Sequence, residues 1–297
     1  MTDRDPIPRD PILRAFEEQR PHLRAVAYRM LGSTGEADDA VQEAWLRLDR
    51  SDAAAIENLG GWLTTVVARI CLNMLRSRNT RREQPLDLRV PDPIVDPIDG
   101  TDPEHEALLA DSVGIAMLMV LETLNPAERL AFVLHDMFGV PFDEIAPLVD
   151  RSPDAARQLA SRGRRRLQAA DPEPDVDLDG QREVVEAFIA ASREGNFERL
   201  MSLLHPDVVL RADFGPERAP QEIRGAETVV AQARTFASLG LKGHVVRVNG
   251  QIGTVALRDG KPFSIGAVRV REGRIAEIDF LADPARLAEL DLSWLPA

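Results

Sequence analysis

Residues 152–167 are SPDAARQLASRGRRRL, a segment that combines a helix start, a stripe of small residues and a run of arginines. Ser152-Pro153-Asp154 is a typical N-cap sequence and predicts a helix that runs to Gln168. Residues three or four apart lie on the same side of a helix, so small residues at that spacing let the helix approach a neighbour closely. Four residues have this spacing: Ala156, Ala160, Gly163 and Leu167.

The opposite side of this helix is basic. Between residues 157 and 166 there are five arginines and no acidic residue. Val140 to Leu167 has the pattern of a helix, a short turn and a second helix, which is the arrangement of a helix-turn-helix. The start of such a second helix can enter the major groove of DNA while flanking arginines hold phosphates. The alternative is a solvated basic face on a bundle helix.

A second basic run lies from Arg69 to Arg82, again without an acidic residue. It follows a polar loop, residues 49–61, and Trp62, so a single DNA strand with an unstacked base could bind beside it. The alternative is the charged end of an ordinary helix. Cys71 lies within this run and is interpreted as a small buried apolar residue.

Charge and proline divide the 297-residue chain into modules. Its formal net charge is −13, and two short stretches carry all of it: residues 83–111 and 171–179. Both also contain several prolines, and like charge combined with proline favours an extended linker over a packed element. The predicted organisation is therefore a helical module 1–84, a linker 85–100, a helical module 101–170, a linker 171–179 and a last module 180–297.

The two helical modules are predicted to contain long amphipathic helices, with Pro21 starting a fresh turn and with one helix over 107–124. The last module changes to an α+β order. We expect helices at 181–194, 197–204 and 226–239, a strand from 208, and four further strands at 244–249, 252–258, 263–271 and 274–281. Hairpin signals join those strands: Asn249-Gly250, Asp259-Gly260 and Glu272-Gly273.

Other classes of protein are excluded or disfavoured by composition. No apolar run approaches the roughly 18 residues that cross a bilayer, and the acidic N-terminus is unlike a signal peptide. The single cysteine excludes an internal disulfide, and the five histidines have no metal-ligand spacing. We expect a cytoplasmic protein with no cofactor, no metal and no membrane partner.

The helical motifs together resemble the extracytoplasmic-function (ECF) sigma factors of bacterial RNA polymerase. The resemblance covers residues 8–168 and rests on DDAVQEAWLRL (38–48), GWLTTVVARICLNMLRS (61–77), LNPAERLAFVLHDMFGVPFDEIA (124–146) and the segment 152–167. The last module resembles a SnoaL-like domain of the NTF2-like α+β cone class, as in ECF sigma factors of the sigma J kind. The implied fold is two all-α sigma domains, the second with a helix-turn-helix, followed by an NTF2-like cone.

The resemblance implies a role for each matching residue. Binding to the β′ clamp helices of the polymerase core is implied for Asp38, Asp39, Gln42 and Glu43. Contact with the melted −10 strand is implied for Arg47, Arg69, Asn73, Arg76, Arg78, Arg81 and Arg82. Recognition of the −35 element is implied for Arg157, Gln158, Ser161, Arg162, Arg164 and Arg165. The β flap of the polymerase is the partner implied for this second sigma domain, and the acidic linker would thread the polymerase cleft.

In the last module, six residues are candidates to line a conical pocket: His205, Asp207, Arg211, Asp213, His244 and Asp279. A His–Asp pair in such a cavity can perform acid–base chemistry, but no spacing here requires it, and we expect no enzyme. The favoured role is regulation of the sigma domains by intramolecular contact, in place of a separate anti-sigma factor; a small-molecule ligand is the weaker possibility.

The sequence departs in three segments from the ECF sigma factors that carry a SnoaL-like extension, called the SnoaL-extended group here. The glycine-rich Asp-Gly-Gly-Gly-Lys segment is replaced by Asp213-Phe214-Gly215-Pro216-Glu217, and an Asn-Pro-Asp-Lys-Leu segment by Asp283-Pro284-Ala285-Arg286-Leu287. A Trp-Leu-Pro motif is absent between residues 85 and 100. The alternative functions are a stand-alone helix-turn-helix regulator whose last module senses a small molecule, and a SnoaL-like enzyme with a DNA-binding front end.

Overall fold

The computed structural model describes residues 9–52, 55–81, 89–100, 102, 105, 114–170, 177–237 and 239–296. The chain forms two compact units. Unit 1 contains Met1–Glu83, Pro103–Asp111 and Val120–Ala170, and unit 2 contains Gln84–Asp102, Ser112–Met119 and Asp171–Ala297. The segment between the two helical modules therefore belongs in large part to the same unit as the last module.

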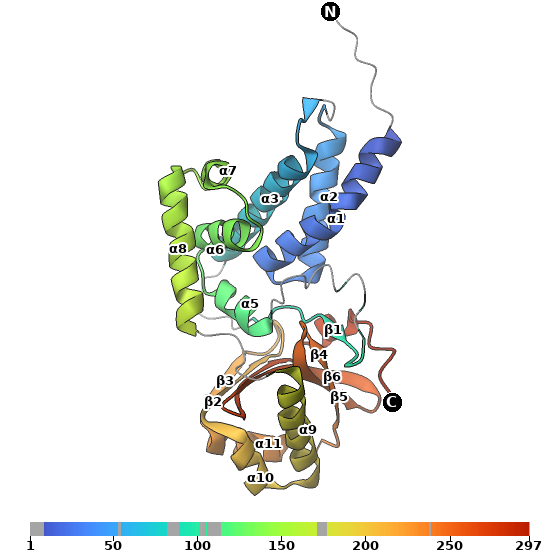
Figure 1. Ribbon diagram of the computed structural model, residues 1–297. Helices are drawn as coiled ribbons and strands as arrows, with labels where there is room; N and C mark the ends of the chain where they lie inside the picture. The colour runs from blue at the N-terminus through green and yellow to red at the C-terminus, as the bar shows by residue number, and fades with distance from the viewer. Residues whose placement is uncertain are drawn as a thin grey trace, which may run out of the picture. The chain divides into compact units, whose positions relative to one another are not determined.

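Unit 1 begins with a three-helix bundle of α1 (Arg9–Leu31), α2 (Thr34–Asp49) and α3 (Leu59–Arg81), seen in blue in Figure 1. Ser33 caps α2, since its hydroxyl accepts a hydrogen bond from the Glu36 N–H. The expectation that Pro21 starts a fresh helical turn was wrong, because Pro21 lies inside the continuous helix α1. Phe16 and Leu23, both buried on either side of the proline, keep the helix packed on the bundle across the hydrogen bond that proline cannot make.

The second part of unit 1 is the expected helix-turn-helix. It comprises α6 (Pro126–Phe132), a π-helical turn η2 (Val133–Met137), α7 (Phe142–Ile145), a 3-10 turn η3 (Ala146–Leu148) and α8 (Pro153–Ala170). The predicted small face of α8 is confirmed, since Ala156, Ala160, Gly163 and Leu167 are buried. Ahead of this motif the helix α5 spans Ile115–Glu122; the first residues of the expected helix 107–124, up to 113, lie outside the described residues.

Arg129 joins the two parts of unit 1. Its side chain is 2% exposed and lies between three acceptors. Nε donates to the Leu121 carbonyl at 2.8 Å, and one terminal nitrogen donates to the Met30 carbonyl at 2.7 Å and to the Glu122 carboxylate at 3.0 Å. A buried guanidinium is stable only when its donors are satisfied, so the end of α1 and the start of α6 are fixed to each other.

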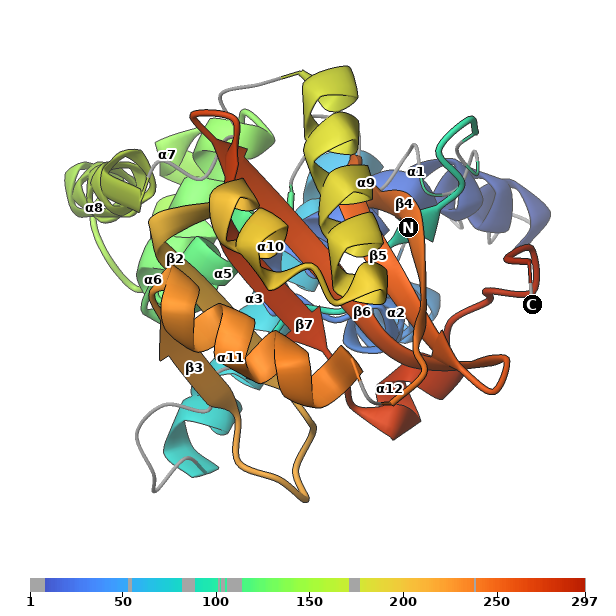
Figure 2. The same ribbon diagram turned by 90° about the horizontal axis from the view of Figure 1, so that it is seen from below.

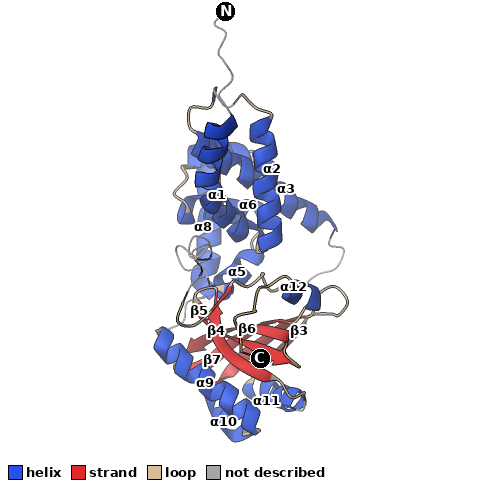
Figure 3. Cartoon of the chain, turned by 90° about the vertical axis from the view of Figure 1, so that its right-hand side faces the viewer, coloured by secondary structure: helices blue, strands red, loops and turns tan. Residues whose placement is uncertain are grey.

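Unit 2 is a mixed sheet, one face of which is covered by the helices between residues 178 and 237, as Figures 2 and 3 show. Its helices are α9 (Leu178–Glu194), α10 (Phe197–Leu203), α11 (Ala226–Ala237) and the short α12 (Pro284–Ala288). Its strands are β1 (Val95–Asp96), β2 (Leu204–Asp213), β3 (Gln221–Arg224), β4 (Lys242–Val248), β5 (Gln251–Arg258), β6 (Lys261–Arg271) and β7 (Arg274–Leu281). Within the described residues they form a seven-stranded sheet of order β1-β4-β5-β6-β7-β2-β3.

The meander β4 to β7 confirms the expected hairpins. Asn249, Asp259 and Glu272 each have a positive φ near 50° and each precedes a glycine with positive φ, as a tight two-residue turn requires. Sequence patterns missed β1, β3 and α12, which are all very short. The face of the sheet that meets α9, α10 and α11 is aliphatic, with Val185, Leu200, Val270 and Ile278 among the buried residues of one cluster.

The segment 89–100 lies along the edge of that sheet. Within it, β1 pairs antiparallel with β4, so that Val95 lies opposite Val248 and Asp96 opposite Arg247. Val90 and Ile94 are 2% and 3% exposed. The linker is extended, as expected, but it forms an ordered part of unit 2.

Gly163 gives a test of the contact between α6 and α8. A Cβ atom at residue 163 would lie 3.0 Å from the Phe132 Cβ, so Gly163→Val should lower the free energy of unfolding of unit 1 by about 1–3 kcal/mol. The measurement is chemical denaturation followed by tryptophan fluorescence.

Gly35→Val is the matched control, because nothing lies within 4 Å of a Cβ at residue 35 of α2. It should leave the stability unchanged or slightly raised. Equal losses in the two variants would contradict the close helix contact.

Candidate nucleic-acid and polymerase interface

The exposed side of α2 carries the residues expected to bind the polymerase. Asp38, Asp39 and Gln42 are exposed, and Leu46 beside them is an apolar side chain that is 39% exposed. Arg24 binds Asp38 at 2.6 Å, and Arg47 binds Glu43 at 3.0 Å. The expected set is therefore on one helix, and its exposed part combines acidic, amide and apolar groups.

The exposed side of α3 carries three of the residues expected at the melted DNA strand. Arg69, Asn73 and Arg76 are exposed at spacings of four and three, so they form one stripe along the helix. Cys71 and Leu72 between them are buried, and burial raises the pKa of the Cys71 thiol, which keeps it protonated and unreactive. The stripe is compatible with a phosphate backbone that runs along the helix.

Arg78 differs from that stripe. It donates to the Leu31 carbonyl at 3.1 Å and forms an ion pair with Glu36, so it holds the end of α1 beside the start of α2. Arg47 is 41% exposed and bound to Glu43. The side chain of Arg81 and all of Arg82 lie outside the described residues.

The arginines of α8 fall into two classes by their partners. Three bind groups of the helix-turn-helix itself. Arg162 binds Glu128 at 2.7 Å, Arg166 donates to the Thr123 carbonyl at 3.0 Å, and Arg164 binds Asp136 at 2.7 Å. Because Glu128 is buried, its pairs with Arg162 and Arg166 hold α8 on its scaffold, whereas the Arg164–Asp136 pair is exposed.

The remaining polar residues of α8 are turned to solvent. Arg157 and Arg165 are exposed, as is Gln158, and Ser161 is half-buried between them. Arg157 contacts exposed Asp154 at 2.7 Å and lies 5.3 Å from the centre of the Phe142 ring. An exposed ion pair of this kind is weak, so Arg157 can exchange it for a base or a phosphate.

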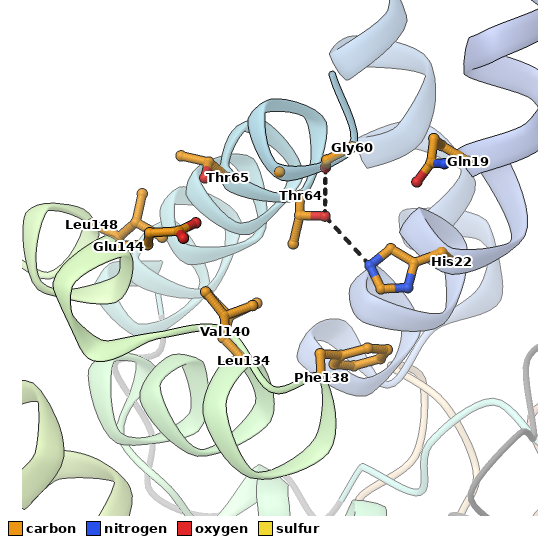
Figure 4. Close-up of a pocket in the computed structure, with 11 residues that line it drawn as sticks. Gln19, His22, Gly60, Thr64, Thr65, Leu134, Phe138, Val140, Glu144 and Leu148 are labelled. Atoms are coloured by element: carbon orange, nitrogen blue, oxygen red, sulfur yellow. Dashed lines mark hydrogen bonds between the residues drawn. The ribbon is translucent and has the colours of Figure 1, made fainter. Parts of the chain in front are cut away.

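Unit 1 also contains a pocket of about 220 Å³ that the sequence did not predict, shown in Figure 4. Its floor is His22 of α1 and Thr64 of α3. The Thr64 hydroxyl donates to the Gly60 carbonyl at 2.9 Å and is 3.4 Å from His22 Nε2. The helix-turn-helix supplies the opposite wall, in which the Phe138 ring meets His22 edge-on at 5.2 Å. The full lining is Gln19, His22, Gly60, Gly61, Thr64, Thr65, Leu134, Phe138, Val140, Glu144 and Leu148.

Unit 2 places the six candidate pocket residues in separate surroundings. Arg211 and Asp279 lie opposite each other on β2 and β7 and bind at 2.9 Å, and they alternate with Leu210 and Ile278, which join the core under the helices. They therefore occupy the other face of the sheet. Asp213 contacts the linker segment, as described below.

The three other candidates are further apart. His205 accepts a hydrogen bond from the Asp207 N–H at 3.2 Å, which is a local turn at the start of β2. His244 is on β4, and β5 and β6 separate it from β7. Among the described residues, no group of three or more His, Cys, Asp or Glu side chains is arranged to hold a metal ion.

Within unit 2, the linker contacts the last module through a cluster of charges. Arg286 of α12 donates to the Asp92 carboxylate at 2.6 Å, to Asp213 at 2.8 Å and to the Val90 carbonyl at 2.6 Å. The same Asp213 accepts the Val90 N–H at 3.0 Å. Asp213 and Arg286 belong to two of the three segments in which the sequence departs from the SnoaL-extended group, and the linker residues Val90 and Asp92 that they hold belong to the third.

Comparison with known proteins agrees with this arrangement. The family model of sigma-70 region 2 matches residues 15–81, and that of sigma-70 region 4 matches residues 115–167. The chain is 39% identical to the ECF RNA polymerase sigma factor SigJ of Mycobacterium tuberculosis, over 91% of each chain. It is 34% identical to the probable ECF RNA polymerase sigma factor SigI of the same species, over 95% of this chain and 96% of the relative.

One solved structure gives the same result. A crystal structure of M. tuberculosis SigJ matches with a TM-score of 0.75 and 34% identity over 94% of this chain and 99% of that one. An NTF2-like protein from Burkholderia xenovorans covers 38% of this chain at 17% identity, with a TM-score of 0.28. In the described part of the chain, no helix is both long enough and apolar enough to cross a membrane.

Asp279 predicts how the stability of unit 2 depends on pH. Burial raises the pKa of Asp279 to about 6, against the opposing effect of Arg211. In the unfolded chain this carboxyl titrates near pH 4. Between about pH 4 and 6 the folded protein therefore binds more protons than the unfolded chain. Proton binding stabilises the folded protein, and this stabilisation is lost as the pH rises through 6. Protection of β2 and β7 in hydrogen exchange should therefore decrease from pH 5 to pH 7, once corrected for intrinsic exchange.

Asp279→Asn should flatten that pH dependence, because the amide does not titrate. Asp259→Asn is the control: it changes an exposed carboxylate of the same unit and should keep the slope. A slope equal in Asp279→Asn and the wild type would contradict the titration.

Proposed function

This chain belongs to the extracytoplasmic-function sigma factors of bacterial RNA polymerase, and from that membership we propose how its parts divide the work of initiation. The exposed side of α2 binds the core enzyme, the α3 stripe binds the melted −10 strand, and the exposed side of α8 recognises the −35 element. The C-terminal domain, residues 180–297, restrains the linker and so controls the sigma domains. Sigma factors are not enzymes, and the stand-alone regulator and the SnoaL-like enzyme are set aside with that membership.

The division of the α8 arginines supports the proposed −35 contact. Arg157, Gln158, Ser161 and Arg165 lie on one exposed side, whereas Arg162, Arg164 and Arg166 bind within the domain. Major-groove recognition needs side chains that can leave solvent without breaking internal bonds. Direct contact with bases and phosphates is therefore proposed for the first set, and positioning of α8 for the second.

The closed contact of the two sigma domains supports a regulated protein. Phe138 of the helix-turn-helix is packed against α1, with the Arg29 guanidinium 5.0 Å from the centre of its ring. Arg129 fixes the same pair of elements through the Met30 carbonyl. A sigma factor that binds two separated promoter elements has to move these domains apart, so this unit 1 corresponds to an inactive arrangement.

The linker is the observation on which the regulatory role rests. A linker that threads the polymerase cleft presents its carboxylates to a basic channel, but Asp92 is only 13% exposed and already bound by Arg286. The linker cannot lie on the C-terminal domain and inside the polymerase channel at the same time. Retention of the linker by the C-terminal domain thus competes with assembly of the holoenzyme, and the domain acts as an inhibitor inside the same chain.

Two arginines of α8 test the proposed −35 contact. Arg165→Ala should weaken promoter binding by the holoenzyme without loss of thermal stability. The slope of log K against log salt concentration should become less steep by the equivalent of about one phosphate contact. Arg162→Ala should mainly lower the thermal stability of unit 1, because it removes the closest partner of buried Glu128. Titration of promoter DNA at several salt concentrations, beside thermal unfolding, separates the two effects. The division fails if both variants change the same quantity equally.

Arg286 tests the regulatory role. Arg286→Ala removes the cation that binds Asp92 and the donor to the Val90 carbonyl, so the linker should be released more easily and the affinity of the full-length chain for core polymerase should rise at least tenfold. Arg258→Ala changes an exposed arginine of the same domain and should leave that affinity unchanged.

The triple replacement of Asp92, Asp96 and Asp99 by Asn provides the opposite case. It frees the linker but removes the charges that the polymerase channel would bind, so its affinity for core polymerase should fall below that of Arg286→Ala. An Arg286→Ala chain that binds core polymerase as the wild type does, with its linker exchanging freely, would refute the regulatory role.

A further inference from the structure

The C-terminal domain binds the backbone of the linker at two positions. At Val90, Asp213 accepts the N–H at 3.0 Å and Arg286 donates to the carbonyl. At Ile94, the Asn249 side chain accepts the N–H at 2.9 Å, and the Asn249 N–H donates to the carbonyl at 2.8 Å. Each of these two linker residues thus has both backbone groups bound and its side chain buried.

The sequence between those two positions suits an extended ligand. Pro91 and Pro93 donate no backbone hydrogen bond and restrict φ, which lowers the entropy lost when an extended segment binds. Asp92 between them turns its carboxylate to Arg286. The bound pattern is therefore aliphatic–Pro–Asp–Pro–aliphatic.

The domain holds these groups in place by contacts of its own. Asp213 accepts the Gly215 N–H at 3.0 Å and pairs with Arg286. Gly215 has φ +80°, and a Cβ there would lie 2.5 Å from the Asp283 carboxylate, so the loop is tightly packed on the N-cap of α12. Asn249 is fully buried at the β4–β5 turn. The linker-binding surface, called the groove below, consists of the Asp213–Arg286 pair, Asn249 and the edge of β4, and it is thus preorganised.

The groove is open to another strand once the linker leaves it. Strand β4 has β5 on one side and only β1 of the linker on the other. An edge strand without a partner exposes backbone donors and acceptors, which an incoming extended peptide can bind by strand addition.

Charge along the groove favours an acidic occupant. Arg286 binds Asp92, Arg247 lies opposite Asp96 in the strand register, and Asp99 contributes after Glu186 to the raised pKa of Arg182. The linker thus places three carboxylates along a basic edge, and an occupant that replaces it needs similar charge.

We propose that the C-terminal domain is a peptide-binding module, and that its groove takes an acidic, extended segment of another protein with the pattern aliphatic–Pro–Asp–Pro–aliphatic in exchange for the linker. The inference rests on the proposed inhibitory role of the linker contact, and it identifies a partner segment as the cause that ends the inhibition. Binding of the partner segment releases the linker and makes it available to core polymerase.

The test uses a fluorescent peptide with the sequence of residues 89–97, RVPDPIVDP, and full-length protein. In wild type the tethered linker competes, whereas Val90→Asp with Ile94→Asp removes the two buried side chains and opens the groove. Fluorescence anisotropy should show binding to this open variant at least tenfold tighter than to wild type. Addition of Arg286→Ala to the open variant should weaken binding at least tenfold, and Arg258→Ala should leave it unchanged.

Specific outcomes overturn the inference. One is an open variant with native circular dichroism that does not bind the peptide, and another is equal binding of a scrambled peptide of the same composition. The inference and the regulatory role can fail separately. If Arg286→Ala raises the affinity for core polymerase but no peptide binds the open variant, the inhibitory contact stands and the exchange with a partner is wrong.

Discussion

A segment of chain can occupy only one binding site at a time, and the linker is held under that constraint through Asp92. Arg286 binds Asp92 together with Asp213 and the Val90 carbonyl, so one guanidinium bridges two carboxylates and a backbone oxygen. The pairing fixes the start of the linker, and the short strand β1 then follows along β4. The proposed competition between a bound linker and a linker inside the polymerase depends on this one interaction.

The need to pair buried acceptors and charges determines which arginines of unit 1 stay exposed. The chain is rich in arginine, and a basic run in the sequence does not reveal which side chains remain available for DNA. Arg78 and Arg129 donate to the carbonyls that end α1, where unpaired acceptors of a helix terminus need partners. Arg162 neutralises buried Glu128. Arg69 and Arg165 stay exposed, and these are among the side chains proposed to bind phosphate.

The sequence predicted those features that depend on local pattern. Hairpin turns followed from Asn249-Gly250 and its two counterparts, and the close face of α8 from the spacing of small residues. The exposed stripe of α3 is a matter of helical periodicity alone. Tertiary contacts were the source of two errors: Pro21 is held inside α1 by packing on both sides, and Arg78 of the basic run is paired with Glu36. The pocket beneath Thr64 needs two modules and has no sequence signal.

The departures from the SnoaL-extended group show why motif absence was a poor guide to contact. Without the glycine-rich segment, Asp213 and Gly215 still supply a carboxylate and a positive φ at the turn after β2. The replacement of Lys by Arg286 adds donors in a fixed plane, and three different acceptors use them. Val90-Pro91-Asp92-Pro93 in turn keeps an aliphatic residue, two prolines and an acid, although the expected tryptophan motif is missing. The interaction therefore depends on the chemistry that each segment presents, and a change of motif on one side is compatible with a contact that is kept.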